Sequence, residues 1–139
     1  MLGKTSISAI RALLLLAQGR GGARWTPRRI AAELGESPTY MAKIVRQLVK
    51  TNILEAEKGA KGGVWFARRA EEVTLLAVVE SCQGTIVGDF CRSERAEESW
   101  CGFHVAAAEL HGAVTGVLAR WTVARLLERR PGRCDEADG

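Results

Sequence analysis

Apolar positions repeat at helical spacing from the start of the chain. Residues 5–18 are expected to form a helix that Thr5 or Ser6 caps and that Gly19 ends. The apolar side chains on one side of this helix are Ile10, Leu13, Leu14 and Ala17. The next segment, GRGGAR, is rich in glycine and predicts a loop.

Two short helix patterns follow, and each opens with a hydroxyl residue and a proline. Thr26-Pro27 and Ser37-Pro38 place a side-chain acceptor at the N-cap and a proline where its missing N–H is not needed. Gly35 is suited to end the first helix in a left-handed conformation. The second helix has an apolar stripe made of Met41, Ile44, Val45, Leu48 and Val49. Two short helices joined by a glycine-containing turn are typical of a helix-turn-helix motif.

Two short runs of strand-forming residues come next. Ile53-Leu54 and Val64-Trp65-Phe66 are separated by the basic, glycine-rich segment KGAKGG. This pattern indicates a β-hairpin. A hairpin directly after a helix-turn-helix motif predicts a winged helix.

Beyond the hairpin, a helix is expected over residues 74–83, with Thr74 as its cap and Gly84 as its end. Residues 104–130 then show one long helical pattern in which small residues cluster: Ala106, Ala107, Ala108, Gly112, Ala113 and Gly116. Glycine inside a helix costs about 1 kcal/mol relative to alanine, and close helix–helix approach is a common compensation. A two-fold axis would bring the same patch together from two chains.

An apolar seam for such a dimer would consist of Leu110, Val114, Val117, Leu118 and Trp121. The alternative is that this helix packs against the winged-helix domain of its own chain.

Charge divides the chain into two unlike parts. Residues 1–70 carry 13 Lys/Arg and 4 Asp/Glu, a balance of +9, whereas residues 71–139 carry 7 and 12, a balance of −5. A basic half suits a polyanion, although a solvated basic surface remains an alternative. No apolar run approaches the roughly 18 residues of a membrane span, and no signal peptide is recognisable. We therefore expect a cytoplasmic protein that does not associate with a membrane.

The helix that opens at Ser37 is the candidate for the major groove of double-stranded DNA. Its first turn offers amides for a phosphate, and the wing tip offers lysines to the adjacent minor groove. Glycines at the tip would allow close backbone approach. The candidate DNA-binding residues are Arg28, Ser37, Thr39, Tyr40, Lys43, Arg46, Lys58, Lys61, Gly62 and Gly63. Gln47 lies on the same helix and is also expected to reach the duplex.

The expected fold class is mainly α with a small β-hairpin, a winged helix-turn-helix domain followed by a long C-terminal dimerisation helix. The expected parts are a DNA-binding domain (1–84), a cysteine-containing sensor loop (85–103), the dimerisation helix (104–130) and a disordered tail (131–139).

The segment SPTYMAKIVRQLVKTNILEAEKGAKGGVWFAR, with EEVTLLAVVESCQG after it, resembles the Rrf2 family of bacterial winged-helix transcription regulators. The specific motifs are S-x-x-Y-x-x-K/Q-I-x-x-x-L-V-K, G-x-x-G-G and E-E-x-T-L-L. The likeness covers residues 1–84 and continues more weakly to 127. It implies a homodimer, acting as a repressor on a palindromic operator, with recognition at Thr39, Tyr40 and Lys43. Ala42 replaces an acidic base-reading residue of some members, which leaves the operator sequence open.

The resemblance extends to the segment CRSERAEESWCGFH, residues 91–104. In many members three cysteines of this loop hold an iron–sulfur cluster. Cys91 resembles the first and Cys101 the last, the middle one is absent, and His104 completes a C-x-x-H end in which the histidine is a ligand. The resemblance thus implies one [2Fe–2S] cluster per subunit, held by Cys91, Cys101 and His104.

A [2Fe–2S] unit needs four protein ligands, and this loop supplies three. The fourth could come from Glu97, Glu98, Cys82 or a partner subunit. Two other interpretations stay open: a metal-free thiol sensor in which Cys91 and Cys101 form a regulatory disulfide, and a site whose function has been lost. Cys82 itself is expected in the core, because it extends the apolar face of its helix.

Classes other than a transcription regulator are less consistent with the sequence. An enzyme is not expected, because there is no C-x-x-C pair and no recognisable set of nucleophile, base and orienting residue. A protein-interaction scaffold that does not bind DNA stays open, although the basic first half and the two lysines of the wing tip argue against it.

Overall fold

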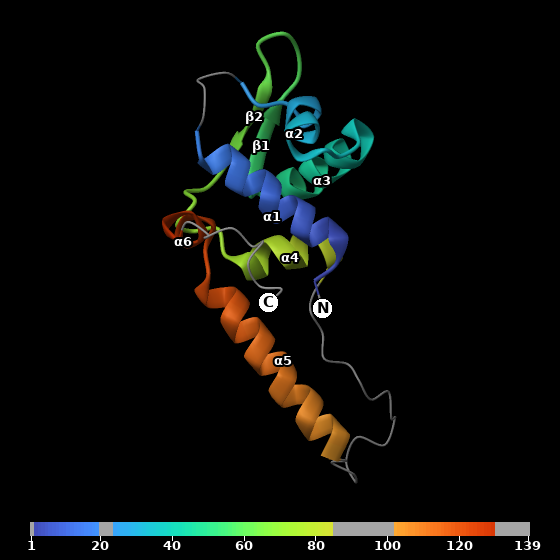
Figure 1. Ribbon diagram of the computed structural model, residues 1–139, viewed down its shortest axis with the longest axis vertical. Helices are drawn as coiled ribbons and strands as arrows, with labels where there is room; N and C mark the ends of the chain where they lie inside the picture. Colours follow the sequence, from blue (N-terminus) through green and yellow to red (C-terminus); the bar gives the residue numbers. More distant parts are fainter. Residues whose placement is uncertain (1, 20–23, 85–101, 130–139) are drawn as a thin grey trace, which may run out of the picture.

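The computed structural model describes residues 2–19, 24–84 and 102–129, and within these ranges it is mainly helical with one two-stranded sheet. Its elements are α1 (Lys4–Ala17), α2 (Pro27–Leu34), α3 (Pro38–Lys50), β1 (Leu54–Glu57), β2 (Gly63–Phe66), α4 (Leu75–Gln83), α5 (Gly102–Arg120) and α6 (Val123–Glu128). Helices α2 and α3 and the hairpin lie at one end, and α5 extends away from them (Figure 1). No helix in these ranges is both long and apolar enough to cross a bilayer.

The helix-turn-helix motif is confirmed together with its local signals. Thr26 Oγ1 accepts a hydrogen bond from Arg29 N at 3.1 Å and caps α2, and Ser37 Oγ accepts one from Tyr40 N at 3.2 Å and caps α3. Gly35 ends α2 in the left-handed region with φ at 68°. The sharp turn between the two helices therefore follows from residues that are adjacent in the sequence.

The hairpin is confirmed as an antiparallel pair; β1 begins one residue later than expected and continues to Glu57, and β2 begins one residue earlier, at Gly63. The register joins Leu54 to Phe66 and Glu57 to Gly63. Trp25, which precedes α2, adds a bridge to the outer edge of β2, where Val64 N donates to Trp25 O at 2.8 Å. This bridge connects the wing to the start of the helix-turn-helix motif.

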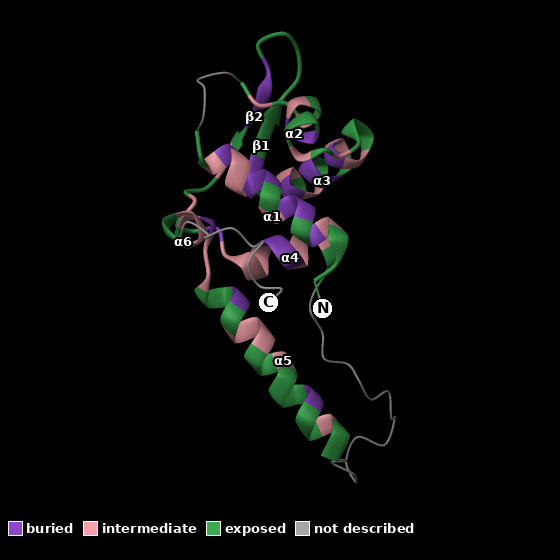
Figure 2. Cartoon of the chain, in the orientation of Figure 1, coloured by how far each residue is buried: buried purple, intermediate pink, exposed green. Residues whose placement is uncertain are grey.

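A single core joins α1, α2, α3, the hairpin, α4 and α6, whereas α5 buries little (Figure 2). The fully buried large side chains of this core include Leu13, Ile30, Met41, Ile44, Leu48, Leu54, Val73, Val78 and Val123. Burying a side chain of this kind contributes about 1.5–3 kcal/mol relative to leaving it exposed. Cys82 is partly buried against the same cluster, which confirms its expected place.

The start of α1 differs from the expectation. The helix begins at Lys4 with Gly3 as its N-cap, so Thr5 and Ser6 lie inside it and do not cap it. Ser6 is fully buried, and its hydroxyl donates to Gln83 Oε1 on α4 at 2.8 Å. The capping signal in the sequence is thus used for contacts between helices.

The single helix expected over residues 104–130 is wrong, because the chain leaves the helix at Thr122. Thr122 is extended, with φ at −114° and ψ at 163°, and forms an antiparallel bridge with Thr74. Two backbone hydrogen bonds flank this bridge, from Leu75 N to Trp121 O (2.8 Å) and from Val123 N to Val73 O (2.9 Å). Pairing with a distant segment overrides the helical pattern here.

Two other parts of the expected organisation are only partly covered. Gly102 and Phe103 are helical, so α5 begins two residues before the expected start of the helix at His104. Residues 85–101, with Cys91 and Cys101, and the tail 131–139 lie outside the described residues.

Gly62→Ala should destabilise the protein by about 1–3 kcal/mol, the usual cost of overpacking. A Cβ at Gly62 would collide with the carbonyl oxygen of Glu57 across the base of the wing tip. Thermal melting followed by circular dichroism measures the effect. Gly102→Ala is the matched control, since a Cβ there meets nothing within 4 Å. Equal melting temperatures for the two variants would contradict this account of the wing.

Candidate nucleic-acid interface

The first turns of α3 present the candidate base-reading side chains. Thr39 and Lys43 are exposed, and Ser37, also exposed, holds the first turn by its cap. Helix α3 keeps its apolar stripe in the core, so its polar side faces away from the domain. The structure therefore leaves these residues accessible to a duplex.

Tyr40 occupies a different environment from Thr39 and Lys43. Its side chain is half-buried, and its hydroxyl donates to Thr5 Oγ1 on α1 at 3.1 Å. The ammonium of Lys4 lies 5.7 Å from the centre of its ring. Tyr40 thus joins the start of α3 to the start of α1, a role that the sequence did not reveal.

A groove of about 530 Å³ separates α3 from the wing. Arg46 and Ala42 line its helix side, Lys58 lines its wing side, and Thr26 and Pro27 close it at the start of α2. Arg46 and Lys58 are both exposed. Two cations on opposite walls of one open groove are an arrangement that suits a phosphate backbone.

Gln47 does not belong to this surface. Its Oε1 atom is buried and has no hydrogen-bond partner among the described residues. The side chain is therefore turned toward the protein, although its position on the helix had suggested a contact with DNA. Helical spacing alone could not distinguish Gln47 from Arg46.

The two glycines at the base of the wing are buried by their own chain. A Cβ at Gly62 would meet Glu57, and one at Gly63 would lie 3.1 Å from Trp25 O. Hairpin closure thus explains Gly62, and the close approach of Trp25 explains Gly63. Of the candidate wing residues, Lys58 and Lys61 are the exposed ones.

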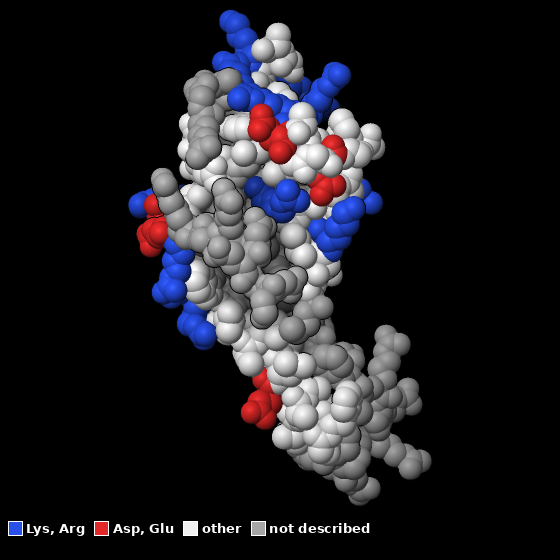
Figure 3. Space-filling view, in the orientation of Figure 1, with Lys and Arg blue, Asp and Glu red and all other residues white. Residues whose placement is uncertain are grey.

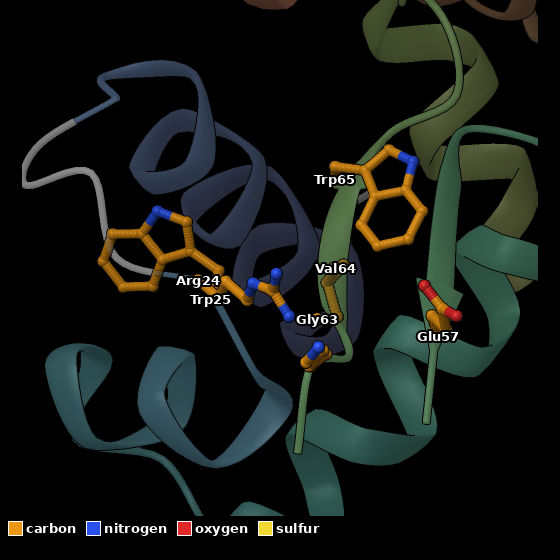
Figure 4. A pocket seen from close by; sticks show the side chains of 7 residues that line it. Arg24, Trp25, Glu57, Gly63, Val64 and Trp65 are labelled. Carbon is orange, nitrogen blue, oxygen red and sulfur yellow. The ribbon is translucent and has the colours of Figure 1, made fainter. Parts of the chain in front are cut away.

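Lys61 lies on the other side of the wing, beside a pocket of about 370 Å³. Trp25 and Trp65 stand on opposite sides of this pocket, with Arg24 between them next to Gly63 and Val64 (Figure 4). Trp65 Nε1 donates to Glu55 Oε2 at 2.8 Å on the outer face of the hairpin. Sequence reasoning missed these aromatic residues.

A six-residue pattern, R-W-T-x-x-R, fixes the entry to α2 and recurs at the entry to α6. In the first copy the Arg29 guanidinium lies 4.3 Å from the Trp25 ring and donates to Arg24 O at 3.3 Å. In the second copy the Arg125 guanidinium lies 4.4 Å from the Trp121 ring and donates to the carbonyl of residue 120 at 3.2 Å. Arg29 is therefore held by its own chain, whereas Arg28 is exposed at the start of α2.

Lysine and arginine side chains gather around the wing and the helix-turn-helix end of the molecule (Figure 3). On the same face α5 is almost uncharged, since Glu109 and Arg120 are its only acidic or basic residues apart from histidine. The cationic end and the neutral arm are thus separate surfaces with different expected partners.

The candidate metal ligands are only partly covered by the structure. His104 is half-buried in the first turn of α5, whereas Cys91 and Cys101 lie outside the described residues. The described residues contain no group of three or more His, Cys, Asp or Glu side chains that would suit a metal ion. Burial raises the pKa of the Cys82 thiol, which disfavours the thiolate form that metal binding requires.

Comparison with known proteins places these features in a family. Residues 2–129 match the Rrf2 family, described as iron-dependent transcriptional regulators. The regulator NsrR of Geobacillus kaustophilus is 30% identical over 126 residues, covering 88% of this chain and 86% of that protein. YwgB of Bacillus subtilis is 33% identical over 76 residues, so the match spans about half of that relative, 49% of its length.

Solved structures agree on the fold. CymR, the global cysteine regulator of B. subtilis, superposes with a TM-score of 0.76 at 18% identity, covering 94% of this chain and 98% of that one. IscR of T. potens gives a TM-score of 0.74 at 18% identity, covering 92% and 86%. The similar proteins are transcription regulators and not enzymes. The chain therefore belongs to the Rrf2 family of winged-helix transcription regulators, which bind DNA.

Proposed function

We propose that this DNA-binding regulator acts as a dimeric repressor that reads a palindromic operator with α3 and the wing. The groove between α3 and the wing carries this proposal, because Arg46 and Lys58 face it from opposite walls. Thr39 and Lys43, exposed on the first turns of α3, are the proposed base-reading residues, and Arg28 at the start of α2 is a proposed phosphate contact. Lys61 extends the basic surface to the outer side of the wing.

The composition of α5 supports the proposed dimer. Only Ala107 and Leu118 are buried along its 19 residues. Phe103, Val105, Leu110 and Val117 are 65%, 48%, 55% and 44% exposed. A long helix with few charges and several exposed apolar side chains is typical of a surface that another chain covers. Leu118 and Trp121 do not belong to the proposed apolar dimer surface. Leu118 is buried in its own chain, and Trp121 lies beyond the end of α5.

We further propose that Cys91, Cys101 and His104 hold one [2Fe–2S] cluster in each subunit. Cysteine thiolates and histidine nitrogens both ligate such clusters, so these residues would supply three of the four protein ligands. His104 lies at the start of α5, next to the residues that carry the proposed dimer contacts. When bound, the cluster would supply redox or nitric-oxide sensitivity at the end of α5 that lies away from the winged-helix domain (Figure 1).

Replacing Arg46 or Lys58 by alanine should weaken binding to duplex DNA and reduce its salt dependence, because these two cations line the groove proposed for the phosphate backbone. The plot of log K against log salt has a negative slope, and each lost phosphate contact makes this slope shallower by about 0.9. Fluorescence anisotropy with a mixed-sequence duplex at several salt concentrations measures this slope. Arg129→Ala removes an exposed cation just beyond the end of α6 and is the control that should keep the wild-type slope. Equal losses for all three variants would contradict the assigned surface.

Gly112→Ala should weaken the dimer while leaving the isolated chain at least as stable. A Cβ at Gly112 meets nothing within 4 Å in its own chain, so the usual helix gain of about 1 kcal/mol is available. In a close α5–α5 contact the same methyl group would collide with the partner. Sedimentation equilibrium measures dimerisation, and melting at low protein concentration serves as the internal control. An unchanged or tighter dimer would rule out close approach at this position.

Anaerobic purification should give a coloured protein that contains iron and acid-labile sulfide. Cys91→Ser or Cys101→Ser should abolish both, whereas Cys82→Ser should keep them because Cys82 packs against the core. Iron and sulfide assays, with an absorption spectrum, provide the measurement. A colourless reconstituted protein whose Cys91 and Cys101 oxidise to a disulfide would replace the cluster by metal-free thiol sensing.

A further inference from the structure

Hydrogen bonds link the C-terminal end of α4 to both ends of α3. The link to the C-terminal end of α3 is direct, and the link to its start runs through α1. Two polar residues of α4, Ser81 and Gln83, make these contacts, and both belong to the last turn of the helix. Neither residue lies on the proposed DNA surface. The proposed function leaves both without a role.

Gln83 reaches the start of α3 through α1. Its Oε1 atom accepts from Gly3 N at 3.1 Å and from Ser6 Oγ at 2.8 Å, so it binds the first turn of α1. In the same turn Thr5 Oγ1 accepts from the Tyr40 hydroxyl at 3.1 Å. Because Tyr40 belongs to the first turn of α3, the path from Gln83 ends beside the proposed base-reading residues.

Ser81 reaches the other end of α3 directly. Its hydroxyl donates to Gln47 O at 3.2 Å and lies 2.7 Å from Thr51 Oγ1. Gln47 O belongs to the last turn of α3 and also accepts from Thr51 N at 3.2 Å, so Ser81 joins the residues that close the end of the helix. The contact therefore fixes the C-terminal end of α3 against α4.

Resting on the proposed operator binding, we infer that Ser81 and Gln83 are positioning residues for base reading. Base-specific contacts need a fixed helix orientation, whereas phosphate attraction tolerates small rotations of the helix. The buried Ser6 hydroxyl makes the Gln83 contact costly to lose, because a buried donor would be left without an acceptor. α4 thereby determines operator selectivity while contributing little to general affinity for DNA.

The inference is tested by measuring selectivity for DNA. The probes are a duplex that the wild-type protein selects from a randomised pool and a mixed-sequence duplex of equal length. Gln83→Leu should lower the ratio of the two affinities at least about fivefold, because the hydrogen bonds from both Gly3 and Ser6 are lost. Affinity for the mixed-sequence duplex and its salt slope should stay at the wild-type values, which also shows that the variant is folded.

Conservative and matched variants separate positioning from a general loss of structure. Gln83→Glu keeps an oxygen acceptor for Gly3 and Ser6 and should restore the selectivity ratio. Gln18→Leu makes the chemical change of Gln83→Leu at the exposed opposite end of α1 and should leave the ratio unchanged.

A double-mutant cycle tests the path itself. Thr5→Val removes the acceptor of the Tyr40 hydroxyl and should lower the ratio, but it should add little to Gln83→Leu because both act through the same turn of α1. Ser81→Ala acts at the other end of α3, so its effect should add to that of Gln83→Leu.

Wild-type selectivity in Gln83→Leu and Ser81→Ala would overturn the positioning role and leave the proposed function intact. A wild-type protein that selects no sequence from the pool would instead overturn the proposed operator binding itself. A loss in Gln83→Leu that Gln83→Glu does not restore would also count against positioning by this hydrogen bond.

Discussion

The fold depends on how α1 is held, because this helix contacts α2, α3, α4 and α6. Its apolar side supplies Ala9, Ala12 and Leu13 to the core. The first turns of α1 also contain two buried serines. Ser6 donates to Gln83 Oε1 on α4. Ser8 donates to Glu36 Oε1 at 2.9 Å, in the turn between α2 and α3. Buried hydroxyls require such partners, so they restrict α1 to one arrangement. The helix-turn-helix motif is consequently oriented by specific polar contacts as well as by apolar packing.

The elements that could be predicted from the sequence are those whose signals are local. Thr26, Ser37 and Thr74 each cap the helix that follows, because a threonine or serine there accepts a backbone N–H three residues later. The break before α6 was missed although Thr122 caps that helix in the same way, accepting from Arg125 N at 3.1 Å. Neither proline nor glycine marks the break, and the pairing of Thr122 with Thr74 is a long-range contact that helical periodicity does not report. The start of α1 was misplaced for a related reason, because Ser6 serves a contact with residue 83, far along the chain.

In the candidate site, too, features with a local sequence signal could be predicted, whereas features set by contacts between elements could not. Exposed cations such as Lys43 and Lys58 follow from helical spacing and from the wing motif, and the structure leaves both accessible. The inward direction of the Gln47 amide and the attachment of Tyr40 to α1 depend on packing between elements, which periodicity does not report. Family membership adds DNA binding to this geometry. In the proposed function the operator sequence would depend on side chains such as Ala42, where this chain departs from the pattern that the resemblance implies.

Hydrogen exchange with and without the selected duplex tests the account most directly, because it reports the bound surface residue by residue. The account predicts slower amide exchange in residues 37–43 of α3 and in the wing from 57 to 63, with α6 unchanged. Slower exchange confined to α6, or none in α3 and the wing despite bound DNA, would contradict a duplex held by the recognition helix and the lysine-bearing hairpin.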